Sequence, residues 1–217
     1  MSLRKELVEI CHRVYDKGFV AAYDGNISVR LPDNTFLITR SGICKGDVEE
    51  DDILEIDSNG DLVNPNGKIS TEFKIHLFAY SRRRDVNAVV HCHPVYATAF
   101  ATAGKFVSYS LRKNIFPEVM LTLGKIPLCE YATPSTEEVP QSLKPYIDSS
   151  WAFLLQNHGA MTLGTSLKDA YYKIEKLEHA AKTIFLARML GGEKEIPENK
   201  VKELFAISEK VYGIKKK

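Results

Sequence analysis

Two histidines, His91 and His93, flank a cysteine at the end of the apolar run AVVHCHP, residues 88–94. Successive side chains of a β-strand point to opposite faces, so the two imidazoles share one face and Cys92 lies on the other. Imidazoles about 6–7 Å apart along a strand can converge on one metal ion. A pair of hydrogen-bonded core histidines explains this spacing at least as well, so the rest of the chain has to decide between the two interpretations.

A third histidine, His158, follows the apolar segment WAFLL, residues 151–155, and precedes Gly159. Binding residues commonly lie where a strand gives way to a turn of this kind. Three neutral imidazoles leave an open coordination position on Zn²⁺, which is typical of catalytic rather than structural sites. His158 is therefore a candidate third ligand from a second strand end.

A fourth candidate ligand, Glu72, lies in the segment KISTEFKIH, residues 68–76. This segment shortly precedes the histidine strand and has the pattern of a helix start. A glutamate at a helix N-terminus is stabilised by the helix dipole without any further role. Its position alone favours that ordinary interpretation.

Three short polar segments have the composition of anion-binding turns. They are Asp24-Gly25-Asn26, Arg40-Ser41-Gly42 and Ser70-Thr71. Glycine lets the backbone approach a ligand, while hydroxyls, amides and helix N-terminal N–H groups donate hydrogen bonds to phosphate. Taken singly, each segment is as well explained as a turn or a helix cap.

Periodicity and turn signals predict the elements that position these residues. Helices are expected over 3–17, 71–83, 95–103, 136–144, 166–190 and 198–211. Strands are expected over 27–30, 35–39, 53–57, 61–63, 88–93 and 151–155, and the segment 105–135 is expected to be irregular or rich in strands. Terminal helices around a middle full of hairpins favour an α/β fold with a central, mainly antiparallel sheet covered by helices.

Composition limits the class of protein. The 217 residues are 44% hydrophobic and 26% charged with a net charge of +1, which fits one folded domain spanning 1–217 and argues against nucleic acid as the main partner. No signal-like or membrane-length apolar stretch is present, so a cytoplasmic location without membrane contact is predicted. The four cysteines lack paired spacing and are expected to be reduced.

Six motifs occur along the chain in one order: GNISVR (25–30), LITRSGI (37–43), STE (70–72), NAVVHCH (87–93), PLCEYAT (127–133) and HG (158–159). Through these motifs the chain resembles the class II aldolase/adducin superfamily over nearly its whole length. Within that superfamily it is most similar to the aldolases of fuculose 1-phosphate. Any one motif is weak, but six in family order and near-family spacing are a specific signal.

The resemblance implies that His91, His93 and His158 bind one Zn²⁺, or another divalent ion, per subunit. It implies Glu72 as catalytic acid or base. It implies binding of the phosphorylated sugar by Gly25, Asn26, Ser41, Gly42, Ser70 and Thr71. The family also forms a C4 homotetramer with active sites at subunit interfaces.

Two family tyrosines concern proton transfer. Tyr212 in the C-terminal VYGI matches one of them and is predicted to be catalytic. The other, supplied by a neighbouring subunit, has no clear match in 105–124. Phe116 falls near its place, and Tyr109 and Glu118 are nearby polar candidates.

By this resemblance the protein is expected to be a zinc-dependent aldolase. It would cleave a ketose 1-phosphate, such as L-fuculose 1-phosphate, to dihydroxyacetone phosphate and a short aldehyde. Alternatives on the same fold are a methylthioribulose-1-phosphate dehydratase and a pentulose-5-phosphate 4-epimerase, which typically has aspartate at the position of Glu72. A non-catalytic adducin-like module lacks the metal site, so the three histidines and Glu72 argue against it.

Overall fold

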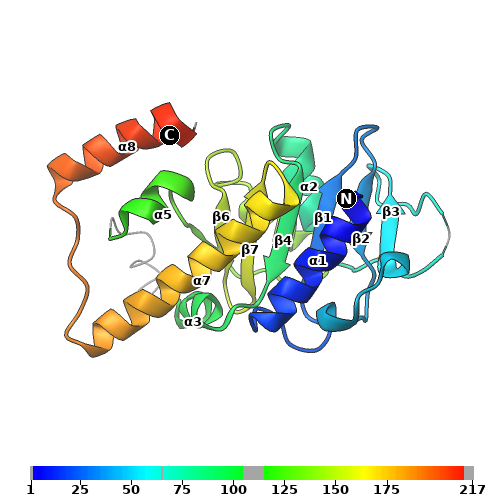
Figure 1. Ribbon diagram of the computed structural model, residues 1–217, viewed down its shortest axis with the longest axis horizontal. Coiled ribbons are helices and arrows are strands. Elements are labelled where there is room, and N and C mark those ends of the chain that lie inside the picture. The colour runs from blue at the N-terminus through cyan, green and yellow to red at the C-terminus, as the bar shows by residue number, and fades with distance from the viewer. Residues whose placement is uncertain (1, 65, 105–114, 213–217) are drawn as a thin grey trace.

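A mainly antiparallel sheet runs through the molecule and carries helices on both faces (Figure 1). The computed structural model describes residues 2–64, 66–104 and 115–212. Within these residues seven strands pair in the order β3-β2-β1-β4-β7-β6-β5. Strands β5 and β6 pair in parallel, and the other neighbouring strands pair antiparallel. The strands are β1 (Asn26–Arg30), β2 (Phe36–Thr39), β3 (Ile53–Ile56), β4 (Ala88–Cys92), β5 (Leu128–Cys129), β6 (Ala152–Leu155) and β7 (Gly159–Gly164).

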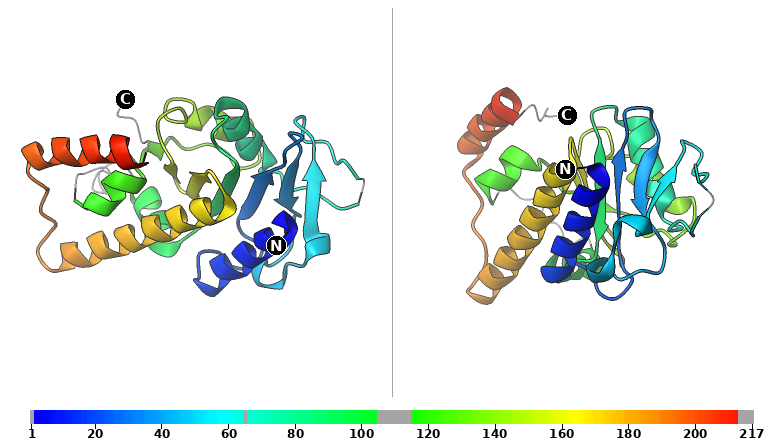
Figure 2. Two further views of the ribbon diagram at one scale, coloured as in Figure 1. Left: turned by 45° about the horizontal axis from the view of Figure 1, so that its top comes forward. Right: turned by 45° about the vertical axis from the view of Figure 1, so that its right-hand side comes forward.

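The helices form a layer on each face of the sheet (Figure 2). One layer contains α1 (Leu3–Asp16), α3 (Val95–Ala103), α5 (Pro117–Thr122) and α7 (Leu167–Met189). The other contains α2 (Phe73–Arg82) and α6 (Glu138–Leu143). Helix α8 (Glu198–Tyr212) packs on α5, and two short 3₁₀ turns cover Lys45–Asp47 and Glu50–Asp52.

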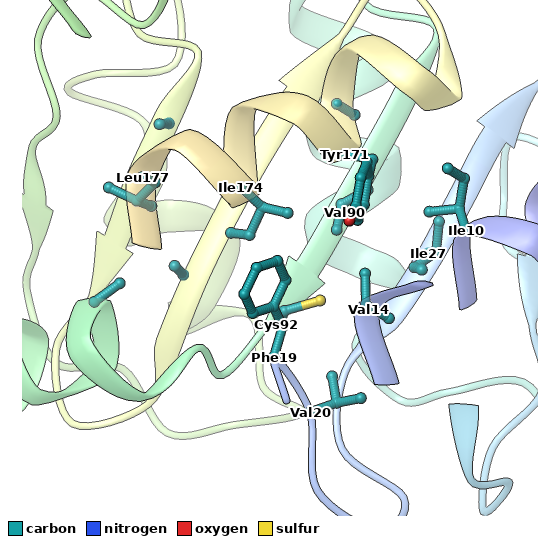
Figure 3. Close-up of a cluster of buried hydrophobic side chains, with 14 of the residues drawn as sticks. Ile10, Val14, Phe19, Val20, Ile27, Val90, Cys92, Tyr171, Ile174 and Leu177 are labelled. Carbon is teal, nitrogen blue, oxygen red and sulfur yellow. The ribbon is translucent and has the colours of Figure 1, made fainter. Parts of the chain in front are cut away.

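Strand β4 divides its side chains between the two layers. Val90 and Cys92 point into the core beneath α1 and α7, where Cys92 lies near Phe19 and Ile174 (Figure 3). Val89 belongs to the core on the opposite face. The strand alternation therefore turns Cys92 away from the histidine face, as the sequence predicts.

Helix α7 begins where its capping residues place it. The Ser166 hydroxyl accepts from the Asp169 amide at 3.2 Å, and the Asp169 carboxylate accepts from the Thr165 amide at 2.8 Å. This reciprocal cap satisfies N–H groups that no intrahelical carbonyl reaches. The predicted start of the helix is confirmed.

Three local predictions differ from the structure. Residues 159–164, which directly follow the expected turn at His158 and for which no strand is predicted, form strand β7, because a central strand buried on both faces lacks the alternating pattern. In the expected irregular segment, Pro117 starts the short helix α5 at its first position, where a missing N–H costs nothing. The expected strand 61–63 is reduced to an isolated bridge between Leu62 and Ile56.

No helix in the described part of the chain is both long and apolar enough to cross a membrane.

Candidate metal and catalytic site

Three imidazoles meet at one end of the central strands. His91 is the last residue but one of β4, and His93 follows the end of that strand. His158 lies in the tight turn that joins β6 to β7. Their ring centroids are 4.8–5.1 Å apart. One nitrogen of each ring lies within 4.8 Å of the others, close enough for a shared metal ion.

Hydrogen bonds fix which nitrogens face the centre. The Ala160 carbonyl lies 3.0 Å from His91 Nδ1, and since a carbonyl only accepts, Nδ1 carries the proton. His91 Nε2 then presents a lone pair 3.3 Å from His93 Nε2. The Asp24 carboxylate lies 3.4 Å from His93 Nδ1, the partner that metal-binding histidines commonly use to hold their tautomer. Lone pairs that face one another are the donor set of a cation site.

Glu72 completes this cluster. It is the residue immediately before α2, but its side chain makes no cap hydrogen bond. Instead Oε1 lies 3.1 Å from His158 Nε2 and Oε2 lies 3.4 Å from His91 Nε2. Among the described atoms Oε1 is buried without a hydrogen-bond partner. A buried, unsatisfied carboxylate oxygen beside three convergent imidazoles fits a divalent cation with nitrogen and oxygen ligands.

The electrostatics of the cluster favour positive charge at its centre. Burial raises the pKa of Glu72, but the His91 and His158 imidazoles outweigh burial and hold that pKa well below its usual range. Burial lowers the pKa of His91, yet the Glu72 carboxylate more than offsets this and raises it. Burial, together with His91 and His158, lowers the pKa of His93 to about 4. The two imidazoles therefore favour the ionised form of the Glu72 carboxylate.

The buried side chains of Asn26 and His76 connect to Glu72 through hydrogen bonds. The Asn26 side-chain nitrogen donates to Glu72 Oε2 at 2.8 Å and to Ser70 Oγ at 3.3 Å. The Asn26 oxygen contacts His76 Nε2. Burial, with a smaller effect from His91, lowers the pKa of His76 to about 3, so this imidazole is neutral.

His76 is a site residue that sequence reasoning missed. On its predicted helix it has no sign of a metal-binding role, and it is not one of the three converging imidazoles, but it is fully buried in the polar network next to Glu72. It follows Glu72 by four residues, the spacing that brings side chains to one face of a helix. That spacing was the signal available in the sequence.

The first anion-binding segment packs directly on the histidine strand. Gly25 has a φ of +72°, and a Cβ there would lie 2.7 Å from the His91 carbonyl oxygen. Only glycine combines this left-handed backbone with so close an approach. The turn therefore holds Asn26, the next residue, beside the cluster.

The other two segments lie beside each other. The Ser41 amide donates to the Lys68 carbonyl at 2.8 Å, and Arg40 pairs with Ile69 in an isolated bridge. At Gly42, with a φ of +74°, no atom lies within 4 Å of the position of a Cβ, so its backbone faces open space.

The hydroxyls of the third segment also link it to its neighbours. Ser70 accepts from Asn26, and Thr71 Oγ1 lies 2.6 Å from Ser135 Oγ. Asn26 and Ser70 thus lie beside Glu72, and Ser41 lies beside Lys68, two residues before Ser70.

The predicted proton-transfer residues are placed less completely. Tyr212 ends α8, but its side chain and the whole of Tyr109 fall outside the described residues. Glu118, on α5, lines an open cleft of about 1030 Å³ together with Tyr96 and Lys176. Phe116 immediately precedes α5 and packs against the core.

Comparisons with known proteins find similar sequences over most of the chain. Residues 5–185 match the family model described as Class II Aldolase and Adducin N-terminal domain. The chain is 33% identical to an L-fuculose phosphate aldolase of Methanocaldococcus jannaschii, covering 84% of this chain and 96% of that protein. It is 32% identical to a 3-oxo-tetronate 4-phosphate decarboxylase of Escherichia coli strain K12, covering 85% of this chain and 87% of that protein.

A solved structure shares the whole architecture. A putative aldolase/epimerase/decarboxylase, YgbL from Klebsiella pneumoniae, aligns with a TM-score of 0.83 at 29% identity and covers 93% of this chain and 97% of that chain. The names of these relatives give different reactions.

Proposed function

Because the chain belongs to the class II aldolase and adducin family and is a lyase, we propose that it cleaves a ketose 1-phosphate, such as L-fuculose 1-phosphate, to dihydroxyacetone phosphate and a short aldehyde. The observation that carries this proposal is the ionised Glu72 carboxylate, held between His91, His158 and the Asn26 amide. That arrangement puts one proton carrier directly beside the cation site.

The metal of the site is proposed to be Zn²⁺, held by His91, His93 and His158. Three imidazole nitrogens suit zinc, although other divalent ions accept the same ligands. When bound, the ion would act as a Lewis acid on the substrate carbonyl. The Asp24 and Ala160 oxygens would keep the His93 and His91 rings in the orientation that this requires.

Glu72 is assigned the proton transfer at carbon. Cleavage of the C3–C4 bond leaves its electron pair on C3, where it is conjugated with the C2 carbonyl as an enediolate. In the cleavage direction the C4 hydroxyl loses one proton and C3 gains one, so the Glu72 carboxylate first takes up a proton and then gives it to C3. In the condensation direction the carboxylate takes that proton from C3 and releases it again. The second direction needs an ionised carboxylate, which the neighbouring imidazoles provide.

The three anion-binding segments are assigned to the phosphate. The hydroxyls of Ser41, Ser70 and Thr71 and the backbone amide of Gly42 are the donors that a phosphate would take. Gly25 and Asn26 complete the rim between this region and the cluster. Anchoring the phosphate would hold the reacting carbons at a constant distance from Glu72.

A second candidate reaction is the decarboxylation of a 3-oxo acid phosphate, which the name of the Escherichia coli relative suggests. Loss of CO₂ from 3-oxo-tetronate 4-phosphate leaves the same enediolate and, after one protonation, the same dihydroxyacetone phosphate. The two reactions differ in the leaving fragment. An aldehyde leaves only after a hydroxyl proton is removed, whereas a carboxylate needs no such base.

The aldolase proposal includes a role for Tyr212 and an assembly of several subunits. Tyr212 would take part in proton transfer at the leaving aldehyde, and a cytoplasmic C4 homotetramer would place active sites at subunit interfaces. Light scattering of the purified protein tests the assembly. A Tyr212→Phe variant tests the tyrosine, because it should slow aldehyde release and leave decarboxylation unaffected.

A coupled assay for dihydroxyacetone phosphate tests the function. L-Fuculose 1-phosphate, ribulose 1-phosphate and 3-oxo-tetronate 4-phosphate are compared on zinc-loaded protein, EDTA-treated protein and Glu72→Gln protein. Release that requires both the metal and Glu72 supports a metal-dependent lyase, and the best substrate decides between aldolase and decarboxylase. No release from any of the three refutes the proposal.

A further inference from the structure

A continuous chain of hydrogen bonds leads from the interior of the fold to Glu72. It passes from the Tyr80 hydroxyl to Ser28 Oγ (2.7 Å), from Ser28 Oγ to His76 Nδ1 (2.6 Å), from His76 Nε2 to the Asn26 oxygen, and from the Asn26 nitrogen to Glu72 Oε2 (2.8 Å). We refer to these contacts as the Tyr80–Glu72 chain. Its first four side chains are buried, so water does not compete for their donors.

The chain has one consistent direction. The Asn26 side-chain nitrogen only donates and lies 2.8 Å from Glu72 Oε2, so the Asn26 oxygen faces His76. That oxygen only accepts, so His76 carries its proton on Nε2.

The rest of the chain follows from this tautomer. A neutral imidazole with a proton on Nε2 accepts at Nδ1, so the Ser28 hydroxyl donates to it. The Tyr80 hydroxyl then donates to Ser28. Each member thereby determines the orientation of the next.

We propose that the Tyr80–Glu72 chain, acting through His76, locks the Asn26 amide with its nitrogen toward Glu72, so that Oε2 is held and Oε1 alone exchanges the proton with substrate. His76 and Asn26 are thus positioning residues. Oε1 faces the candidate metal ligands, 3.1 Å from His158 Nε2, and receives no hydrogen bond from the Tyr80–Glu72 chain, whereas Oε2 has the Asn26 donor. The catalytic part of this inference rests on the proposed function, because it needs Glu72 to carry the proton.

Removing the donor at His76 should free the Asn26 amide to rotate and loosen Glu72. His76→Leu is expected to lower kcat by about 100-fold, the effect of misplacing a catalytic group by about 1 Å, with little change in KM. His76→Gln can place an amide nitrogen near the position of Nε2. It should therefore recover kcat to within about tenfold of wild type. Ser28→Ala removes the donor to Nδ1 and serves as a second probe if His76→Leu does not fold.

The matched control is His12→Gln, which changes a histidine on α1 whose Nε2 contacts the Val48 carbonyl at 2.9 Å. It should leave kcat and KM unchanged. A folded, zinc-loaded His76→Leu protein with wild-type kcat, or with a raised KM and unchanged kcat, overturns the proposal. The same holds if His76→Gln is as slow as His76→Leu.

A readout independent of turnover separates this proposal from the proposed function. Nitrogen-15 NMR of histidine-labelled protein reports which ring nitrogen of His76 is protonated, with His76→Gln to assign the signal. Protonation at Nε2, lost or exchanged with Nδ1 in Ser28→Ala, supports the chain even if no tested substrate is cleaved. Protonation at Nδ1 in the wild type overturns the chain whatever the activity.

Discussion

Gly159→Ala is a small change aimed at the metal site. Gly159 begins β7 directly after His158, and its backbone does not occupy the left-handed region, so alanine adds steric conflict without backbone strain. The new Cβ would lie 2.5 Å from His93 Cδ2 and 2.7 Å from the Cys92 carbonyl oxygen. An ordinary contact begins at 3.4 Å, so the His93 ring must move by about 0.9 Å or the strands must separate.

That displacement is large for a metal ligand. Zinc–nitrogen bonds of about 2.0–2.1 Å tolerate deviations of about 0.2 Å. We therefore expect His93 to lose its place and zinc affinity to fall by about 100-fold, the upper end of the loss seen when a ligand's support is removed. The free energy of unfolding of the metal-free protein should fall by about 1–3 kcal/mol, as for other overpacked cores.

The assay is competition for Zn²⁺ between the protein and a chelator of known affinity, with urea unfolding of the metal-free protein measured in parallel. Gly164→Ala is the matched control, because it lies at the other end of β7 and clashes with the backbone of α7 at Ala170. Gly164→Ala should lower the free energy of unfolding. At urea concentrations below its unfolding midpoint it should keep the zinc affinity of the wild type. Wild-type affinity in Gly159→Ala, or an equal loss in Gly164→Ala, would refute the reasoning.

Three further predictions concern charge, metal and burial. Glu72→Gln keeps the shape of the side chain but removes its charge, so product release should fall by about 10²–10⁴-fold while zinc counted per chain stays the same. EDTA should lower the urea midpoint, and zinc returned at about 100 times its Kd should restore about 2.7 kcal/mol; equal midpoints with and without zinc would contradict a site in the folded state. Burial raises the pKa of the Cys129 thiol from 9.0 to about 12. The neutral Cys129 thiol therefore contributes fully to the free energy of unfolding below pH 9. This contribution is lost as the pH rises toward 12, and the free energy of unfolding then falls with a slope approaching about 1.4 kcal/mol per pH unit. Urea unfolding from pH 9 upward should show a shallower loss in Cys129→Ala than in wild type, and parallel curves would contradict this assignment.

Local patterns were sufficient for much of the fold. The alternation along 88–93 separated Cys92 from the two histidines, and the Ser166–Asp169 cap placed the start of α7, because both depend on backbone geometry within a few residues. Local patterns did not predict strand β7, residues 159–164. A strand between two partners is apolar on both faces, so its period-two signal disappears.

The candidate site divides in the same way. The residue types indicated His91, His93 and His158 as one candidate metal set, since few other side chains bind metal near neutral pH, whereas Glu72 joined them only through the resemblance to the family. His76 was missed because its four-residue spacing from Glu72 indicates only a shared helix face, and nothing in the sequence marks its burial or its contact with Asn26. Its role depends on Asn26, fifty residues earlier in the chain.

The sequence by itself determined the chemistry available to this protein and the face on which each strand presents it. Tertiary structure decided which of these groups meet. Strand β7 pairs with β4 and brings His158 to His91, while α2 packs on the opposite face of β4 from α7 and turns Glu72 toward the imidazoles. The physical reason is that alternation and capping are set by neighbouring residues, whereas strand partners and helix orientation are set by the total apolar burial of the whole chain.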